Sequence, residues 1–554
     1  MSSFDAVDLE VLWGRLIAVM DEMESVVVRT TFSTILRESR DFAVILTDTE
    51  GRSICQSSLS TATFSAVFPR TAKALLERFP IDTLEPGDVL VTNDPWLGTG
   101  HLPDYILLTP VFRNGRPVAC VGSVAHVSDV GGHPGEIEGD DVFAEGLRIP
   151  PAKIVRAGHE DPLLFDVIGA NTRAPELLLG DLRAMIGAAR IGARGIVEFL
   201  RSSGLTDLDA LAERFLTTSE AHMRRRIREL PDGAYAARME IDGYVETVTL
   251  AVTVTIAGDE AVVDYAGTSG LSPHGAINVP YGSTLATTIY PFKCALAPEI
   301  PNNEGLFRPI RVEVPAGCIL DAPDPAPVKA RAKTTNNLNQ VLFTALWPVF
   351  GEHVNASNGG IWPLVLKGEE PDRGRYLVDM LPHGGRGGQP TMDGMVPVSY
   401  PNNSAITPCE VLEVDAPIRF LEKALRPDSA GAGRFRGGLG QTIAFRHVGS
   451  RPMTFSLTPD RITTPPIGLA GGRDAPLGRV LINGQHVERF PPITLQPGDE
   501  VVLDLPGGGG FEPPELRGRD ATERDLAAGY LTAAGAARDY PTSNDPARRD
   551  DDHA

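Results

Sequence analysis

Residues 92–133 read TNDPWLGTGHLPDYILLTPVFRNGRPVACVGSVAHVSDVGGH, and two extended apolar runs within them flank the tetrapeptide RNGR. These runs cover residues 105–112 and 117–126. An Asn-Gly pair between such runs is the strongest short signal for a two-residue hairpin turn. We therefore predict a β-hairpin that turns at Asn114 and Gly115.

This hairpin is expected to gather three potential metal ligands at its open end. His126 would face position 103, which lies between His101 and Asp104. The two imidazoles would share one side, while Pro103 interrupts the ladder and lets the chain turn Asp104 inward. Two imidazoles and one carboxylate suit a divalent transition metal such as Zn, Mn or Fe, with positions left for water or substrate. The pattern indicates an open, catalytic metal site.

Neighbouring residues support or compete with this interpretation. Four glycines, at 98, 100, 131 and 132, would let the backbone approach a small ligand closely. Asp94 and Asp129 are candidates for orienting the histidines, and His133, followed by Pro134, is a weaker ligand candidate. The alternative is that these histidines are ordinary polar groups with protein partners.

Composition bounds the class of protein. A chain of 554 residues predicts three or four folding units, and its 42% hydrophobic and 22% charged residues are ordinary globular values. No stretch approaches the roughly 18 to 20 apolar residues of a membrane span. The net charge of -21 is spread along the chain, which argues against a nucleic-acid partner. The N-terminus lacks the pattern of a secretory signal, so we expect a cytoplasmic protein.

Periodicity predicts an α+β fold. Helical spacing and strand alternation occur without regular βα repetition, which favours a large mixed multi-layer body with hairpin-rich ends and a helical middle. Helices are expected at 7–32, 175–230 and 334–350, a hairpin of two extended runs at 38–57, and strands at 234–265 and 375–505. The expected parts are an N-terminal α+β region with the metal site (1–160), a helical segment (161–230), a β-rich region with a following helix (231–370), a β-rich glycine-containing region (371–515), and an extension (516–554) that ends in a disordered tail.

Several specific motifs are spread along the chain. They are LRESRDFAVILTD (36–48), NDPWLGTGHLPD (93–104), AHVSDVGGHPGE (125–136), EGLRIPP (145–151), NTRAPELLLGDLRA (171–184), IPNNEGLFRPI (300–310), DSAGAGRFRGGLG (428–440) and LPGGGGFEPPELR (505–517). On these motifs the chain resembles the hydantoinase B/oxoprolinase family over about residues 7–540.

This resemblance implies a subunit of an ATP-dependent enzyme. Such B-type chains work with an A-type subunit of ASKHA-like kinase fold, which binds ATP and Mg and phosphorylates the substrate, and an α2β2 assembly is expected. Their enzymes open hydantoins, 5-oxoproline or lactams, or, in relatives, carboxylate ketones. The present chain has no GxxxxGK[ST] loop, which agrees with this division of labour. The metal ligands implied are His101, Asp104 and His126, with Asp41 as the fourth.

The resulting hypothesis is a cyclic amide hydrolase in which metal-activated water attacks a substrate phosphorylated by the partner. Asp129 or Glu136 is expected to act as general base, and Arg37, Arg40 and Arg386 are expected to hold phosphate or carboxylate. The alternative for each arginine is an ordinary salt bridge. Two other functions stay open: a subunit of a ketone carboxylase, against which the chain length argues, and a non-catalytic scaffold for an ATPase, against which the intact ligand set argues.

Overall fold

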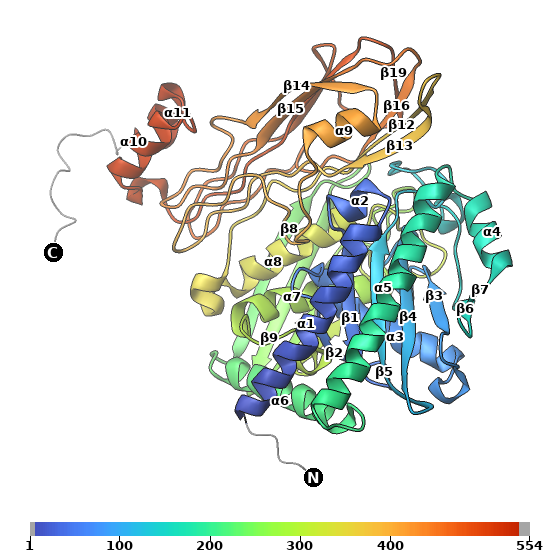
Figure 1. Cartoon of the computed structure of the whole chain (residues 1–554). Coiled ribbons are helices and arrows are strands. Elements are labelled where there is room, and N and C mark those ends of the chain that lie inside the picture. The colour runs from blue at the N-terminus through green and yellow to red at the C-terminus, as the bar shows by residue number, and fades with distance from the viewer. Residues whose placement is uncertain (1–5, 542–554) are drawn as a thin grey trace.

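The computed structural model describes residues 6–541, and it has helices and four sheets stacked in layers without regular alternation (Figure 1). This arrangement confirms the predicted α+β class. The expected disordered tail falls almost entirely in residues 542–554, outside the described part of the chain. No helix within residues 6–541 is long and apolar enough to cross a membrane.

The helices are α1 (Ala6–Thr30), α2 (Thr34–Arg37), α3 (Ala62–Arg78), α4 (Pro162–Ala170), α5 (Pro175–Ser202), α6 (Asp209–Arg228), α7 (Tyr281–Leu296), α8 (Ala332–Phe350), α9 (Cys409–Asp415), α10 (Arg519–Ala527) and α11 (Ala533–Asp539). The strands of the first half are β1 (Phe42–Thr47), β2 (Ser53–Gln56), β3 (Val89–Thr92), β4 (Asp104–Arg113), β5 (Arg116–His126), β6 (Ala152–Arg156), β7 (His159–Glu160), β8 (Gly233–Ile241), β9 (Val248–Ala257), β10 (Glu260–Asp264) and β11 (Ile310–Glu313). Those of the second half are β12 (Leu364–Glu370), β13 (Gly374–Met380), β14 (Ile418–Leu425), β15 (Gln441–His447), β16 (Met453–Leu457), β17 (Arg479–Ile482), β18 (Gln485–His486), β19 (Ile493–Leu495) and β20 (Glu500–Asp504).

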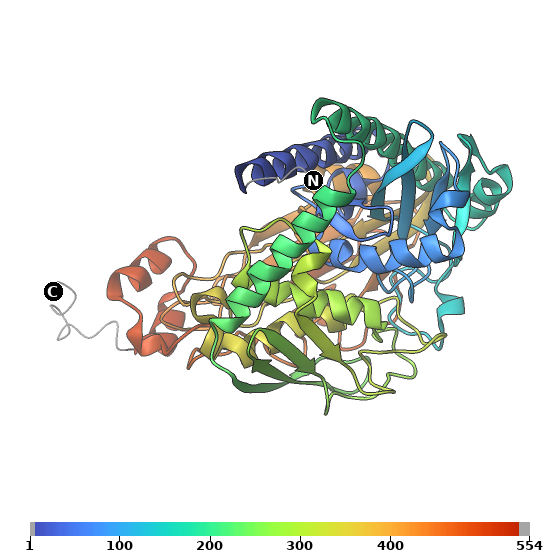
Figure 2. The same ribbon diagram turned by 90° about the horizontal axis from the view of Figure 1, so that it is seen from below.

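A seven-stranded sheet, in the order β2-β1-β5-β4-β3-β6-β7, forms the centre of the N-terminal part. Helices α1 and α5 cover one face, and α3 covers the other (Figures 1 and 2). Every residue of β1 is buried, since both faces of the sheet are covered. Close packing also explains Gly122 on β5, where an added Cβ would lie 1.9 Å from the ring of Phe68 on α3.

Helices α3 and α7 were not predicted from the sequence. Each contains an internal proline, Pro69 and Pro291, and α7 is rich in threonine and aromatic residues, which have modest helix propensity. Burial overrides these preferences, because the two helices pack on each other and lie between sheets. Tertiary packing therefore decides their conformation.

The middle of the chain supplies a second four-stranded sheet, in the order β11-β10-β9-β8. Helix α8 packs against β8 and β9 and also against α7, so the helices α3, α7 and α8 form a layer between the two sheets. Two further sheets, of order β13-β12-β16-β19 and β14-β15-β20-β17-β18, share one apolar core in the C-terminal part. The predicted strand-rich segment 375–505 contributes most of their strands.

Glycine-rich segments of the C-terminal half pack backbone against backbone. Amide N–H groups of one segment donate to carbonyl oxygens of the next: Gly359 to Gly385 at 2.8 Å, Gly388 to Gly509 at 2.9 Å, and Gly508 to Gly438 at 2.9 Å. Side chains would prevent this approach. At Gly387, for example, an added Cβ would lie 1.9 Å from the carbonyl oxygen of Ala356.

The variant Gly387→Ala should therefore unfold more easily, by about 3 kcal/mol or more, the upper part of the range for overpacking. Thermal melting monitored by circular dichroism would measure the change. Gly187→Ala is the matched control, because Gly187 lies in α5 with nothing within 4 Å of an added Cβ. Equal melting temperatures for the two variants would contradict the close packing.

Candidate metal centre

The hairpin predicted around Asn114 and Gly115 is present. Both residues have positive φ, 51° and 77°, as a two-residue turn of this kind requires, and Arg113 pairs with Arg116 across it. The turn signal in the sequence was therefore sufficient to place β4 and β5 side by side.

The register at the open end differs from the prediction by one residue. His126 pairs with Asp104, whereas position 103 was expected, because the register shifts between Val111 and Phe112. Phe112 pairs with Pro117, which has no N–H for the ladder, and the bulge follows directly after this proline. The shift places the carboxylate itself opposite the imidazole.

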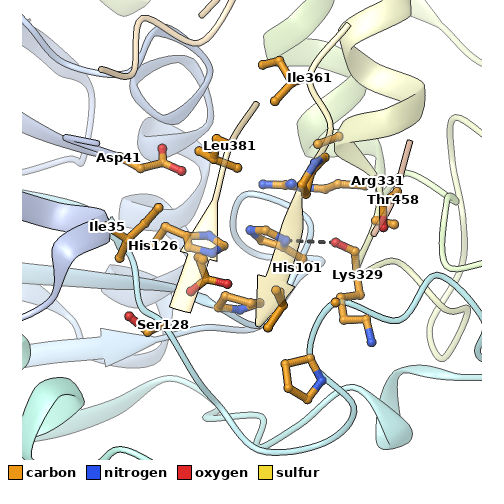
Figure 3. A pocket seen from close by; sticks show the side chains of 18 of the residues that line it. Ile35, Asp41, His101, His126, Ser128, Lys329, Arg331, Ile361, Leu381 and Thr458 are labelled. Atoms are coloured by element: carbon orange, nitrogen blue, oxygen red, sulfur yellow. Dashed lines mark hydrogen bonds between the residues drawn. The ribbon is translucent and has the colours of Figure 1, made fainter. Parts of the chain in front are cut away.

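His101, Asp104 and His126 converge, and their potential ligand atoms all lie within 4.8 Å of one another. Asp104 Oδ1 is 2.8 Å from His101 Nε2 and 2.9 Å from His126 Nδ1. The two imidazole centroids are 5.1 Å apart (Figure 3). A loop and the paired ends of β4 and β5 thus bring together the three residues that the sequence indicated.

His101 is oriented by a segment far away in the sequence. Its Nδ1 lies 3.1 Å from the carbonyl oxygen of Lys329, which can accept only from a protonated Nδ1 (Figure 3). Nε2 then carries the free lone pair. This atom is buried without a hydrogen-bond partner in the described residues, although Asp104 Oδ1 is close.

Asp104 is held by its second oxygen. Oδ2 accepts a hydrogen bond from Arg331 Nη2 at 2.9 Å and another from Thr99 Oγ1, which leaves Oδ1 facing both imidazoles. Burial would raise the pKa of Asp104, but His101, His126 and Arg331 outweigh it and hold this pKa well below its usual range. The carboxylate is therefore ionised and preoriented.

The pKa values of the two histidines shift in opposite directions. Burial, with the charge of Arg331, lowers the pKa of His101 to about 4, so its ring is neutral. Burial also opposes protonation of His126, but the hydrogen bond and charge of Asp104 raise its pKa to about 9. An unpartnered imidazole nitrogen beside an ionised carboxylate and a second imidazole fits a divalent cation such as Zn, Mn or Fe.

Asp41 lies next to this cluster. Its backbone carbonyl accepts from the His126 N–H at 3.0 Å, and its carboxylate turns toward the cavity, across from His126 (Figure 3). Burial raises the pKa of Asp41 to about 6, with His126 acting in the opposite direction. Asp41 is thus in reach of the site but outside the three-residue cluster.

His101 and His126 of this cluster line a cavity of about 190 Å³, to which distant parts of the chain contribute. Sequence reasoning missed several of its polar residues. They come from the connection between β5 and β6 (Glu145), from the segment before α8 and its first turn (Lys329, Arg331 and Lys333), and from β13 (Asp379). The signals available were the alternating cations of VKARAK, residues 328–333, and the single carboxylate in the apolar run YLVDML, residues 376–381.

Asp379 is one of two carboxylates in the described cavity lining that have a buried oxygen without a hydrogen-bond partner; the other is Glu145, at Oε2. The Oδ2 atom of Asp379 is buried and has no hydrogen-bond partner in the described residues. Burial raises the pKa of Asp379 to about 7, and the nearby charge of His126 reduces this effect. Such a group takes up and releases a proton near neutral pH.

Lys329 and Glu145 form the opposite side of the cavity. Glu145 Oε1 accepts from the backbone N–H groups of Val328 and Lys329, at 2.6 and 2.9 Å, and so holds the segment whose carbonyl orients His101. Lys329 Nζ donates to the carbonyl of His133. Burial lowers the pKa of Lys329 to about 8.

Asp129 lines the cavity, but its carboxylate is already engaged. Oδ1 accepts from Arg173 Nη1 at 2.7 Å and from Gly131 N–H, and Oδ2 accepts from Thr172 Oγ1 and the Arg173 N–H. These bonds tie the loop after β5 to the start of α5. The geometry favours a structural role over the general-base role expected from the sequence.

Asp129→Asn should accordingly destabilise the fold by about 1.5 to 3 kcal/mol, the size of a lost charge-assisted hydrogen bond, and leave bound metal unchanged. Melting temperature and metal content would measure this. Asp140→Asn is the control, because Asp140 forms an exposed pair with His274 that should contribute little. Loss of turnover at an unchanged melting temperature would restore the general-base role.

The other predicted residues lie as follows. Glu136 lines the cavity, with Lys367 Nζ 3.7 Å away. Arg37 and Arg40 are exposed, and Arg386 stacks on Tyr400. None of these three arginines is in the described lining of the cavity. The exposed His133 is likewise absent from this lining.

The expected role of Asp94 in orienting the histidines is wrong. Its carboxylate binds Arg148 and the Trp96 N–H instead. The Lys329 carbonyl orients His101 and Asp104 orients His126, because the segment before α8 reaches the site and Asp94 faces away from it.

Comparisons with known proteins identify the family and several relatives of the chain. A family model described as hydantoinase B/oxoprolinase matches residues 5–514. A putative D-/L-hydantoinase subunit from Pseudomonas sp. (strain NS671) is 31% identical over 570 residues, covering 98% of this chain and 95% of that protein. The crystal structure of the ATP-dependent caprolactamase from Pseudomonas jessenii has a TM-score of 0.89 at 27% identity, covering 99% of this chain and 98% of that one. An acetone carboxylase structure shares the fold, with a TM-score of 0.87 at 18% identity over 96% of this chain and 79% of that one.

Proposed function

Because this chain belongs to the hydantoinase B/oxoprolinase family, we propose that it is the ring-opening subunit of an ATP-dependent cyclic amide hydrolase. The observation that carries the proposal is the convergence of His101, Asp104 and His126 beside a cavity that the two histidines line. Relatives whose names refer to hydantoinase and caprolactamase support the class of substrate. The substrate would be a hydantoin, 5-oxoproline or a lactam.

Cyclic amides need activation, because amide resonance makes the carbonyl carbon a poor electrophile. An A-type partner subunit, in an α2β2 assembly, would transfer the γ-phosphoryl group of ATP to the amide oxygen. The names of relatives as subunits of larger enzymes support such a partner. The phosphorylated substrate would then enter the cavity of this chain.

His101, Asp104 and His126 would hold a divalent cation, with Asp41 as the fourth ligand. A cation bound there would polarise substrate oxygen atoms and lower the pKa of nearby water. The protein prepares this set in advance, since the Lys329 carbonyl fixes the ring of His101 and Arg331 fixes the carboxylate of Asp104.

Asp379 would act as the general base. Its unpartnered Oδ2 takes a proton from the attacking water while the new C–O bond forms at the former amide carbon. The same carboxyl group then donates this proton to the ring nitrogen. As the C–N bond breaks, the hydroxyl group added from water passes its remaining proton to the departing nitrogen and becomes the carbonyl of an acyl phosphate, so that the amine leaves. A second water hydrolyses the remaining acyl phosphate to a carboxylate and free phosphate.

Lys329 would hold the phosphoryl group during these steps. Lys329 lines the cavity, whereas the described lining includes none of Arg37, Arg40 and Arg386, the arginines expected from the sequence to hold phosphate. The helix α8 begins at the same place, so its N-terminal N–H groups add to the positive potential.

Reconstitution with an A-type partner tests the proposal. Hydantoin, 5-oxoproline and caprolactam would each be incubated with ATP and Mg, and ADP and the ring-opened product would be quantified by mass spectrometry. We expect product only when both subunits and ATP are present. Carboxylation of a ketone in the presence of bicarbonate, without ring opening of any amide, would assign the carboxylase function instead, and ATP turnover without either product would indicate a scaffold.

A further inference from the structure

A second cavity, of about 290 Å³, lies beside α3 and α7 and contains none of the residues of the metal cluster. Its walls come from the β2–α3 connection, from α7, and from the segments around Asn302 and Asn403. The mechanism proposed for the metal cavity uses none of these residues.

Neutral polar groups dominate the chemistry of this second cavity. Amide and hydroxyl side chains line it, namely Gln56, Ser58, Ser60, Ser65, Tyr290, Asn302 and Asn403. Lys293 is the one cationic residue among the described residues that line the cavity, and no carboxylate is among them. The walls are therefore suited to a ligand with one negative charge and several hydrogen-bonding atoms.

Two acceptor atoms in these walls lack donors. Gln56 Oε1 and Asn302 Oδ1 are buried and have no hydrogen-bond partner in the described residues. Burying an unsatisfied acceptor is costly, so a ligand that brings N–H groups would be favoured here. An ammonium group supplies up to three such donors.

Lys293 is prepared to receive an anion. Its Nζ donates to the carbonyl oxygens of Ala297 and Pro298, at 2.6 and 3.1 Å, which fixes the ammonium and leaves one of its three hydrogens free. Glu299, the one carboxylate that acts on its charge, lies outside the described lining of the cavity. A carboxylate could accept the remaining hydrogen.

We propose that this cavity binds a small amino acid, with its carboxylate at Lys293, its ammonium at Gln56 and Asn302, and its aliphatic part against Ala66, Ala286, Ile289 and Phe307. This ligand class rests on the proposed function, because opening a cyclic amide yields an amino group and a carboxylate on one chain. The cavity would be a product-binding site separate from the metal site.

The two cavities share a wall. Residues Thr61, Thr63 and Phe64 line the metal cavity, while Ser60, Ala62 and Ser65 line the second one. The loop at 401–403 divides in the same way, since Asn402 faces the metal cavity and its two neighbours face the other. A bound amino acid would therefore position the wall of the metal cavity, which couples product binding to turnover.

Calorimetric titration of the assembled complex without ATP tests this site. The probes are 6-aminohexanoate, which has both charges, and hexanoate and hexylamine, which each have one. We expect 6-aminohexanoate to bind at least tenfold more tightly than either, and Lys293→Gln and Gln56→Leu to weaken it at least tenfold. Ala66→Leu fills the cavity and removes no polar group, and it should also weaken binding of 6-aminohexanoate at least tenfold. It keeps the test valid if either of the other two variants fails to fold.

The His126→Ala background separates this site from the metal cavity. Binding that persists in His126→Ala but is lost in Ala66→Leu supports the proposal. Binding lost in His126→Ala and retained in Ala66→Leu would place the amino acid in the metal cavity and overturn it, as would absence of binding or equal affinity for hexanoate. Since no turnover is involved, failure of the hydrolase function leaves this result interpretable.

Discussion

Replacing His126 with alanine should remove the bound divalent ion and reduce turnover to background. His126 supplies one of the three convergent donor groups, with its Nδ1 2.9 Å from Asp104 Oδ1. Loss of an outer partner alone lowers metal affinity by about 10- to 100-fold, so loss of a ligand should exceed about 100-fold. Plasma mass spectrometry on the complex, with an assay of ring opening, would measure both effects.

The fold should survive this change, because His126 ends β5 and its side chain is 20% exposed. His133→Ala is the matched control: His133 belongs to the same glycine-rich region but is exposed, and it should keep both metal and activity. Retention of about one ion per chain in His126→Ala would show that this residue is no ligand. A wild-type complex that is active without any ion would contradict the metal site as a whole.

Asp379→Asn should lower kcat by about 10²- to 10⁴-fold, the usual contribution of a general base, with little change in KM or bound metal. The amide cannot take the proton from water. Because the base acts in its ionised form, the wild-type rate should rise with pH and level off at or below about pH 7, the value to which burial raises the pKa of Asp379. A cation bound nearby shifts this rise of the rate to lower pH. In Asp379→Asn the rise should be absent.

The pH dependence of stability independently tests the raised pKa of Asp379. Burial raises the pKa of Asp379 in the folded chain from 3.8 to about 7, so the folded state binds the proton more tightly than the unfolded state does. Stability is therefore lost as pH rises from about 4 to 7. Without bound metal, Asp379→Asn should raise the melting temperature at pH 8 more than at pH 4.

The exposed Asp372, on the turn of the same β12–β13 hairpin, provides the control variant Asp372→Asn, which should change neither rate nor melting temperature. If Asp379→Asn loses metal together with activity, Asp379 is a ligand. If it retains full activity, the base lies elsewhere, and Glu136 and Glu145 are further carboxylates on the cavity wall.

Local signals in the sequence were sufficient for the hairpin that carries the site. The Asn-Gly turn placed β4 beside β5, and the spacing of His101, Asp104 and His126 from that turn predicted their convergence. Helical periodicity likewise predicted α1, α5 and α6. Each of these features depends on residues close together in the chain, where turn chemistry and amphipathic spacing act directly.

Tertiary structure decided the rest. The bulge after Pro117 shifted the register by one residue, and packing between sheets made helices of α3 and α7 against their local propensity. Lys329, Arg331 and Asp379 reach the metal cluster from more than 200 residues away, so no spacing rule could place them. The sequence by itself therefore determined which residues could bind a metal, while their orientation, their charge states and the proton-accepting group depend on burial and on contacts that exist only after the layers have assembled.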